Sequence, residues 1–230
     1  MTDAVQYRKM YSMHMGRKNK GFHYQLGNKE LRSTEEEKDL GVIIHKSTKT
    51  SRQCNAAAAK ANKILGFIRR TVVSRQKSII INLYKTLVRP HLEYCSQVWS
   101  PALQKDKDIL EKVQRRATKM IQGLGKLHYT DRLRECGLTT LERRRCRGDL
   151  IQTYKLITRK EITPYTRFFQ LENRKGLRGH RYKLSKKAEG PIKQRFFSSR
   201  VVNTWNELSD ETVSVESTNS FKIKLGKIGY

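Results

Sequence analysis

Apolar side chains in the segment YKTLVRPHLEYCSQVWSP, residues 84–101, recur at a spacing of three and four residues around a proline. This spacing is typical of the buried face of an α-helix. Two neighbouring rows fit it: Leu83, Leu87, His91, Tyr94 and Val98, and, half a step away, Tyr84, Val88, Cys95 and Trp99. Because Pro90 removes one backbone donor and disfavours helical geometry at Arg89, we expect the helix to bend or divide there. A buried, bent helix predicts a packed domain.

The net charge of the chain restricts its partners. The 230 residues contain 49 Lys and Arg against 21 Asp and Glu, a formal net charge of +28 at pH 7. Self-repulsion of this size opposes compaction unless a polyanion offsets it, so nucleic acid is the first candidate partner and an acidic membrane surface the alternative. No apolar run approaches the roughly 20 residues that span a bilayer, and the first residues lack the apolar core of a signal peptide. We therefore expect an intracellular protein, in the nucleus or cytoplasm, that is not secreted.

The cysteines do not form a metal-binding pattern. Cys54, Cys95, Cys136 and Cys146 are too far apart for paired-cysteine zinc sites, and no histidine pair lies beside them at ligand spacing. We expect free thiols in a reducing compartment, no metal site and no bound cofactor.

Hydrophobic periodicity predicts a mainly α fold with three regions. The expected regions are short strands and hairpins over 1–48, a helical domain over 49–160 and a basic extension over 161–230. Helices are expected at 51–72, 75–99, 105–123, 129–137 and 140–158. Within the extension, residues 174–187 mix basic residues with glycine and tyrosine and predict a loop or hairpin. Residues 195–208 predict a final amphipathic helix with Phe197, Val201, Val202 and Trp205 in the core, and not as base-stacking platforms.

Several sequence blocks occur in a characteristic order: KMYSMHMG, EEEKDLGVII, SRQC with AAAKAN, LYKTLVRPHLEYCSQVWSP, LEKVQRRATKMI and LERRRCRGDLIQTYK. This succession resembles the carboxyl-terminal portion of the reverse transcriptase of non-LTR retrotransposons of the jockey and chicken-repeat type. The resemblance covers residues 7–225 and includes the tail, FFSSRVVNTWNELSDETV followed by SFKIKL. Ser209 and Asp210 stand where that family often has a Leu-Pro-like turn.

The resemblance implies an arrangement of end of palm, thumb and tail. Lys9 is similar to the palm lysine that follows the catalytic strand, and Leu40, Gly41 and Val42 look like the primer-grip hairpin. The helices after residue 51 would then form the thumb, which closes over the minor groove of a template–primer duplex. On this interpretation Pro90 shapes a thumb helix and performs no chemistry.

The catalytic half of such an enzyme is not recognisable in the sequence. Members of the family polymerise DNA with carboxylates that hold two magnesium ions, and no Asp-Asp pair occurs in the chain. Asp106 and Asp108 are two residues apart on a helix, so their side chains point in different directions, and the acidic run 35–37 lies in a polar turn. We interpret all five as surface residues. Met1 lies just past the place where the catalytic turn would be. We therefore expect a fragment that binds nucleic acid without polymerising alone.

The sequence offers many candidate phosphate-binding residues. They are Lys9, Arg69, Arg70, Arg115, Arg116, Arg143, Arg144, Arg145, Arg178, Arg181, Lys183 and Lys186. Two alternatives remain open: a basic structural RNA-binding protein, and an accessory half of a split reverse transcriptase with a separately encoded palm. The preference for RNA, DNA or a hybrid is open as well.

Overall fold

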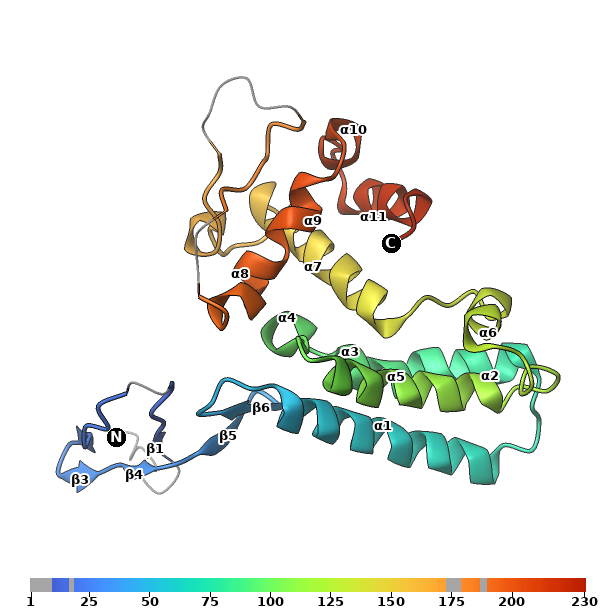
Figure 1. Ribbon diagram of the computed structural model, residues 1–230, viewed down its shortest axis with the longest axis horizontal. Helices are drawn as coiled ribbons and strands as arrows, with labels where there is room; N and C mark the ends of the chain where they lie inside the picture. Colours follow the sequence, from blue (N-terminus) through green and yellow to red (C-terminus); the bar gives the residue numbers. More distant parts are fainter. Residues whose placement is uncertain (1–9, 17–18, 173–178, 187–189) are drawn as a thin grey trace, which may run out of the picture.

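The computed structural model describes residues 10–16, 19–172, 179–186 and 190–230. Its fold is mainly helical, with small two-stranded sheets gathered near the amino terminus (Figure 1). A parallel pair joins β1 and β4, and antiparallel hairpins join β2 to β3 and β5 to β6. The strands are β1 Tyr11–Ser12, β2 Gln25–Leu26, β3 Lys29–Glu30, β4 Arg32–Ser33, β5 Glu36–Asp39 and β6 Val42–His45. The prediction of a mainly α fold is confirmed.

The hairpin β5–β6 turns at two residues with positive φ. Leu40 has φ 44° and Gly41 has φ 87°, the signs that a two-residue type I′ hairpin requires. The predicted hairpin at this place is confirmed. Val42 is buried, and the Ile43 N–H donates to Gln53 Oε1 at 2.9 Å, so the hairpin is fastened to the first helix.

The central helices form one packed bundle. They are α1 Ser51–Thr71, α2 Lys77–Leu83, the π turn Tyr84–Val88, α3 Arg89–Glu93, α4 Ser96–Trp99, α5 Gln104–Lys119, α6 Tyr129–Glu135 and α7 Leu141–Ile157. Small side chains at Ala57, Ala58 and Ala61 let α5 approach α1 closely, and both helices run in the same direction (Figure 1). Gln114, at the centre of α5, accepts from the Tyr84 hydroxyl at 2.7 Å and donates to the Tyr129 hydroxyl at 2.9 Å.

The helix around Pro90 is interrupted differently from the sequence expectation. A π turn precedes the proline, with the Arg89 N–H donating to the Tyr84 carbonyl, and the break follows at Cys95, where φ is 53°. A π turn holds more residues than an α turn, so side chains four apart stay in line along the buried face. That buried row is Tyr84, Val88 and Leu92, and Trp99 is buried beyond the break, in α4. The expectation that Leu87, Tyr94 and Val98 lie in the core is wrong, because each is exposed by 46% or more.

A second hydrophobic cluster is built from the carboxyl-terminal half of α7 and the tail. Its elements are the 3₁₀ turns Tyr165–Arg167 and Lys193–Arg195, α8 Phe197–Arg200, α9 Val202–Asn206, α10 Asp210–Val213 and α11 Thr218–Lys227. Val201, Val202 and Trp205 are buried there, as the sequence predicts, whereas Phe197 is half-buried at the edge of the cluster. The rings of Tyr154 and Phe221 stack with centroids 4.3 Å apart. The predicted helix over 195–208 is divided into α8 and α9, and it is not the final one, because α10 and α11 follow it. The two clusters meet within α7, before the expected boundary at residue 160.

Truncation of the two leucines should separate the buried row from the exposed one. Leu92 is 0% exposed and Leu87 is 46% exposed. We expect Leu92→Ala to lower the free energy of unfolding by about 2–5 kcal/mol through lost contacts and a residual cavity. Leu87→Ala, the matched control, should lower it by about 0.5 kcal/mol. Denaturant unfolding followed by far-UV circular dichroism measures both, and equal losses would contradict the assignment.

Candidate nucleic-acid interface

A groove between the carboxyl-terminal halves of α1 and α5 collects cationic side chains. Its volume is about 570 Å³. The lining residues are Asn62, Leu65, Gly66, Arg69, Arg75, Arg116, Lys119 and Met120. Half of them are cationic and none is acidic, so the groove offers an anion several positive charges and no repulsive carboxylate on its walls.

The parallel packing of α1 and α5 brings these residues together. Arg116 Nη1 on α5 donates to Asn62 Oδ1 on α1 at 3.1 Å. Beyond the two helices, the Gln122 N–H donates to the Arg75 carbonyl at 3.0 Å. Arg69 and Arg116, both predicted from the sequence as phosphate-binding residues, therefore line the same groove.

The cations of the groove differ in their freedom to meet a ligand. Arg75 donates to the carbonyls of Val72 at 2.7 Å and Arg69 at 2.8 Å, so its guanidinium closes the end of α1. Within the described part of the chain, Arg69, Arg116 and Lys119 form no ion pair with a carboxylate. These three side chains are the ones available to an anion.

Sequence reasoning did not select Arg75 or Lys119 for this site. Lys119 follows Arg116 by three residues, and residues three apart on a helix are neighbours on its surface. This spacing could have identified Lys119. Arg75 lies outside any helix, and only the folded chain brings it to the groove.

Two further predicted cations lie near the groove without lining it. Arg70 is exposed in the last turn of α1, where a cation complements the helix dipole. Arg115 is exposed, and its guanidinium lies 4.2 Å from the centroid of the Tyr129 ring, within cation–π range.

The three consecutive arginines of α7 point in different directions. Arg143 is exposed and lies 5.8 Å from the Tyr230 ring. Arg144 forms a two-bond ion pair with Glu93, including Nη2 to Oε2 at 2.9 Å, and these hydrogen bonds raise the pKa of Arg144. Arg145 is only 3% exposed, and this burial lowers its pKa. The prediction that Arg145 contacts phosphate is wrong, because consecutive helix residues cannot share one exposed face.

The basic extension contributes cations on a short antiparallel bridge between Leu171 and Leu184. Arg181 is exposed with its guanidinium 4.9 Å from the Tyr182 ring. Lys183 is half-buried, and Lys186 is exposed at the rim of a polar cavity. Lys9 and Arg178, two other predicted residues, lie outside the described residues.

The hairpin that resembles the primer grip precedes the amino-terminal end of α1 (Figure 1), whereas the groove lies along the carboxyl-terminal half of this helix. Leu40 is 84% exposed at its tip, where the Tyr94 hydroxyl donates to the Leu40 carbonyl at 2.9 Å. The start of α1 and Arg69 are separated by about 25 Å along the helix axis. The structure therefore does not bring the hairpin and the groove into one site.

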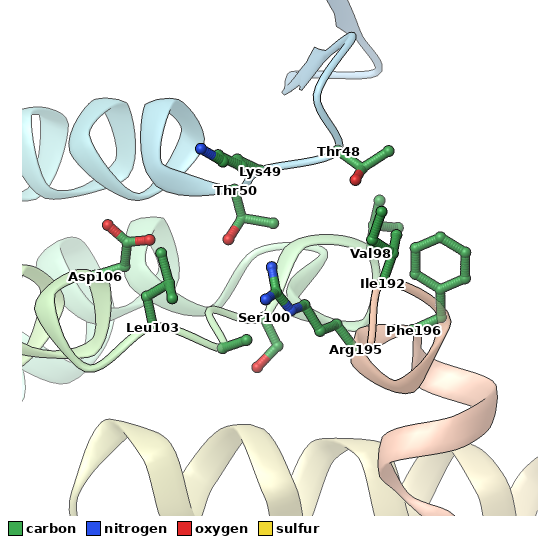
Figure 2. A pocket seen from close by; sticks show the side chains of 11 residues that line it. Thr48, Lys49, Thr50, Val98, Ser100, Leu103, Asp106, Ile192, Arg195 and Phe196 are labelled. Carbon is green, nitrogen blue, oxygen red and sulfur yellow. The ribbon is translucent and has the colours of Figure 1, made fainter. Parts of the chain in front are cut away.

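A small cavity of about 40 Å³ lies at the amino-terminal ends of α1 and α5 (Figure 2). Asp106 lines it and is 1% exposed, with Oδ2 accepting from Ser51 Oγ at 2.7 Å. Figure 2 shows the Arg195 side chain extending between Thr50 and Ser100. The interpretation of Asp106 as a surface residue is wrong, because the parallel packing of the two helices buries it.

Possible metal ligands do not converge in the described ranges. Among these residues no group of three or more His, Cys, Asp and Glu side chains could hold a metal ion. The four cysteines are free thiols, and burial raises the pKa of Cys54 to about 12.

Comparisons with known proteins give no relative for this chain. No family model, no curated protein and no solved structure matches it. In the described part of the chain, no helix is both long enough and apolar enough to cross a membrane.

The burial of Arg145 leads to a prediction about stability and binding. Its Nε and Nη1 atoms are buried without a hydrogen-bond partner in the described structure. We expect Arg145→Met to change the free energy of unfolding by less than about 1 kcal/mol or to raise it, because it removes an unpaired buried cation. Nucleic-acid affinity should be unchanged.

Arg144→Met is the matched control for this substitution. It breaks the ion pair with Glu93 and should lower the free energy of unfolding by about 1–2 kcal/mol. Urea titration compares both variants with the parent chain. A large loss of nucleic-acid affinity in Arg145→Met, with the fold intact, would restore Arg145 to the interface.

Proposed function

We propose that the chain binds nucleic acid without sequence preference, through phosphate contacts in the groove between α1 and α5. The observation that carries the proposal is the set of unpaired cations on acid-free walls, in a chain of net charge +28. Lysine and arginine side chains that neutralise phosphates release condensed counterions, and this gain does not depend on base sequence.

We further propose that this binding is the template–primer clamp of a reverse-transcriptase-like protein. The order of elements supports the proposal: the hairpin β5–β6 leads directly into α1, which packs against the π turn, α3 and α5. A palm-end hairpin followed by a helical thumb has this order in the family that the sequence resembles. Magnesium and the catalytic carboxylates would belong to the intact family enzyme.

The surroundings of Asp106 and Asp108 support a role in binding, without polymerisation, for the chain on its own. Asp106 is buried and hydrogen-bonded to Ser51, whereas Asp108 is exposed and accepts from Gln104 at 2.9 Å. The two carboxylates therefore face different surroundings. A pair that held two metal ions would need to converge on one open site.

Salt dependence tests the groove directly. Between about 50 and 200 mM salt, a clamp that neutralises on the order of six phosphates should lose roughly a thousandfold in affinity for a duplex. The triple variant Arg69→Gln, Arg116→Gln and Lys119→Gln should reduce the slope of log affinity against log salt by up to about 3. Fluorescence anisotropy with a labelled duplex measures the slope.

A triple variant with the same loss of charge serves as the control. Arg159→Gln, Lys160→Gln and Lys227→Gln alter exposed cations outside the groove. The control should leave most of the slope in place. Equal slopes in the two triple variants would show that net charge, and not the groove, governs binding, and no duplex binding at low salt would refute the proposal.

Primer extension tests the absence of polymerisation by the chain alone. We expect no template-dependent incorporation by the purified chain with deoxynucleotides and Mg²⁺ or Mn²⁺, because no carboxylates of the described residues converge to hold the ions. In the split-enzyme alternative, addition of a palm that carries such carboxylates would start synthesis. Incorporation by the chain alone, after control for contaminating polymerase, would contradict the expectation.

A further inference from the structure

A second cavity, separate from the cationic groove, lies where α4, α7 and α8 meet. Its volume is about 610 Å³, within the range of small-ligand pockets. Apolar side chains from three elements form much of its wall, namely Val98, Leu156, Phe168, Phe196 and Phe197. No function discussed above uses this cavity, which we call the aromatic pocket.

The aromatic pocket keeps two rings accessible to solvent. Phe168 is 41% exposed and Phe196 is 49% exposed. Phe168 lies edge-on to Phe197 at a centroid distance of 6.1 Å, and Phe197 also contacts Phe169 edge-on at 5.5 Å. Figure 2 shows Phe196 beside Val98 and Ile192. Phe168 is thus positioned by neighbouring rings while part of it remains free for another flat group.

Unpaired polar groups line the same pocket. The side chains of Gln97 and Gln152 are half-buried, and in the described structure neither side chain forms a hydrogen bond. An amide carries donors and an acceptor side by side, the arrangement that pairs with the edge of a nucleobase. Glu161 is the one acidic lining residue, and it pairs with Lys155 at 3.0 Å.

Cations flank the aromatic pocket on two sides. A polar cavity of about 460 Å³ shares Phe168 and Ser198 with it and is lined by Arg167 and Lys186. On the other side, the small cavity of Figure 2 shares Val98 and Phe196 with it and is lined by Lys49 and Arg195. Among the described residues, none of these four cations forms an ion pair.

We propose that the aromatic pocket binds an unpaired nucleobase of a single-stranded segment, whose neighbouring phosphates lie on the flanking cations. Single-stranded nucleic acids are bound by this combination of aromatic rings and a positively charged track. An acidic peptide with an apolar anchor would satisfy the rings and the cations, but it would leave the two free amides unused. The inference rests on the proposed function in one respect, namely that the partner is a nucleic acid. The pocket does not depend on the groove, because the two share no residue.

The test compares single-stranded and duplex binding by the full chain. The probes are a fluorescently labelled oligothymidylate and a labelled blunt-ended duplex without unpaired bases, measured by anisotropy at low salt. The double variant Phe168→Ala and Phe196→Ala should lose roughly fivefold to a hundredfold in affinity for oligothymidylate. Affinity for the duplex should be unchanged, since paired bases cannot enter the pocket.

Matched controls separate stacking from general loss of apolar surface. Phe67→Ala removes a ring that is 59% exposed on α1, outside the pocket, and should change neither affinity. Phe168→Tyr with Phe196→Tyr keeps both rings and should keep the parent affinity. Thermal melting checks that the variants fold. Photo-crosslinking of an oligonucleotide that contains 5-bromouridine should place the adduct at residue 168 or 196.

Each other outcome overturns a defined part of the argument. Unchanged oligothymidylate affinity in the alanine double variant, or adducts confined to the groove, would refute the pocket while leaving the groove intact. Ring-dependent binding of a phenylalanine-containing polyglutamate peptide, without an effect on oligothymidylate, would assign the pocket to a protein partner and refute the inference. Ring-dependent oligothymidylate binding that persists in the groove triple variant, with no duplex binding by the parent, would refute the proposed function alone.

Discussion

The ion pair between Arg200 and Asp149 connects the two hydrophobic clusters of the protein. Arg200 donates to Asp149 at 2.8 and 3.0 Å, and further to the carbonyls of Ser96, Gln97 and Arg195. Burial raises the pKa of Asp149 even though the hydrogen bonds from Arg200 lower it. Keeping the Asp149 carboxylate ionised therefore has a desolvation cost, so the ion pair is weak evidence for stability. Its structural effect is to fix α8 against α4 and α7 at the edge of the aromatic pocket.

Helix α7 takes part in both hydrophobic clusters. Leu141 packs in the cluster formed by α1 to α6, whereas Leu150 and Tyr154 pack in the cluster of the tail. A helix shared by two cores turns different faces inward along its length. Near the start of α7 the inward face carries Leu141 and, four residues on, Arg145, so Arg145 is buried, whereas Arg143 lies on the opposite face and is exposed.

The parts of the structure that depend on periodicity could be predicted from the sequence. The buried faces at Val113 and Ala117 and at Val202 and Trp205 follow from spacing alone. The exposure of Leu87 could not be predicted, because a π turn shifts the phase of the helix without a local signal. The cationic groove could not be predicted either. Its cations come from α1 and α5, which are distant in sequence, and the sequence does not show that these helices pack in parallel.

The parallel alignment of α1 and α5 sets the way in which the groove can hold an anion. Both helix dipoles place their negative ends there, and at the end of α1 the carbonyls of Arg69 and Val72 accept hydrogen bonds from Arg75. The positive charge that an anion would meet there comes from long, rotatable side chains, because the dipoles of the two helices do not favour an anion at their carboxyl-terminal ends. If the groove binds nucleic acid as proposed, such a surface would respond to the amount of charge along a strand and not to its shape. A bound polymer could then slide along the groove without being released.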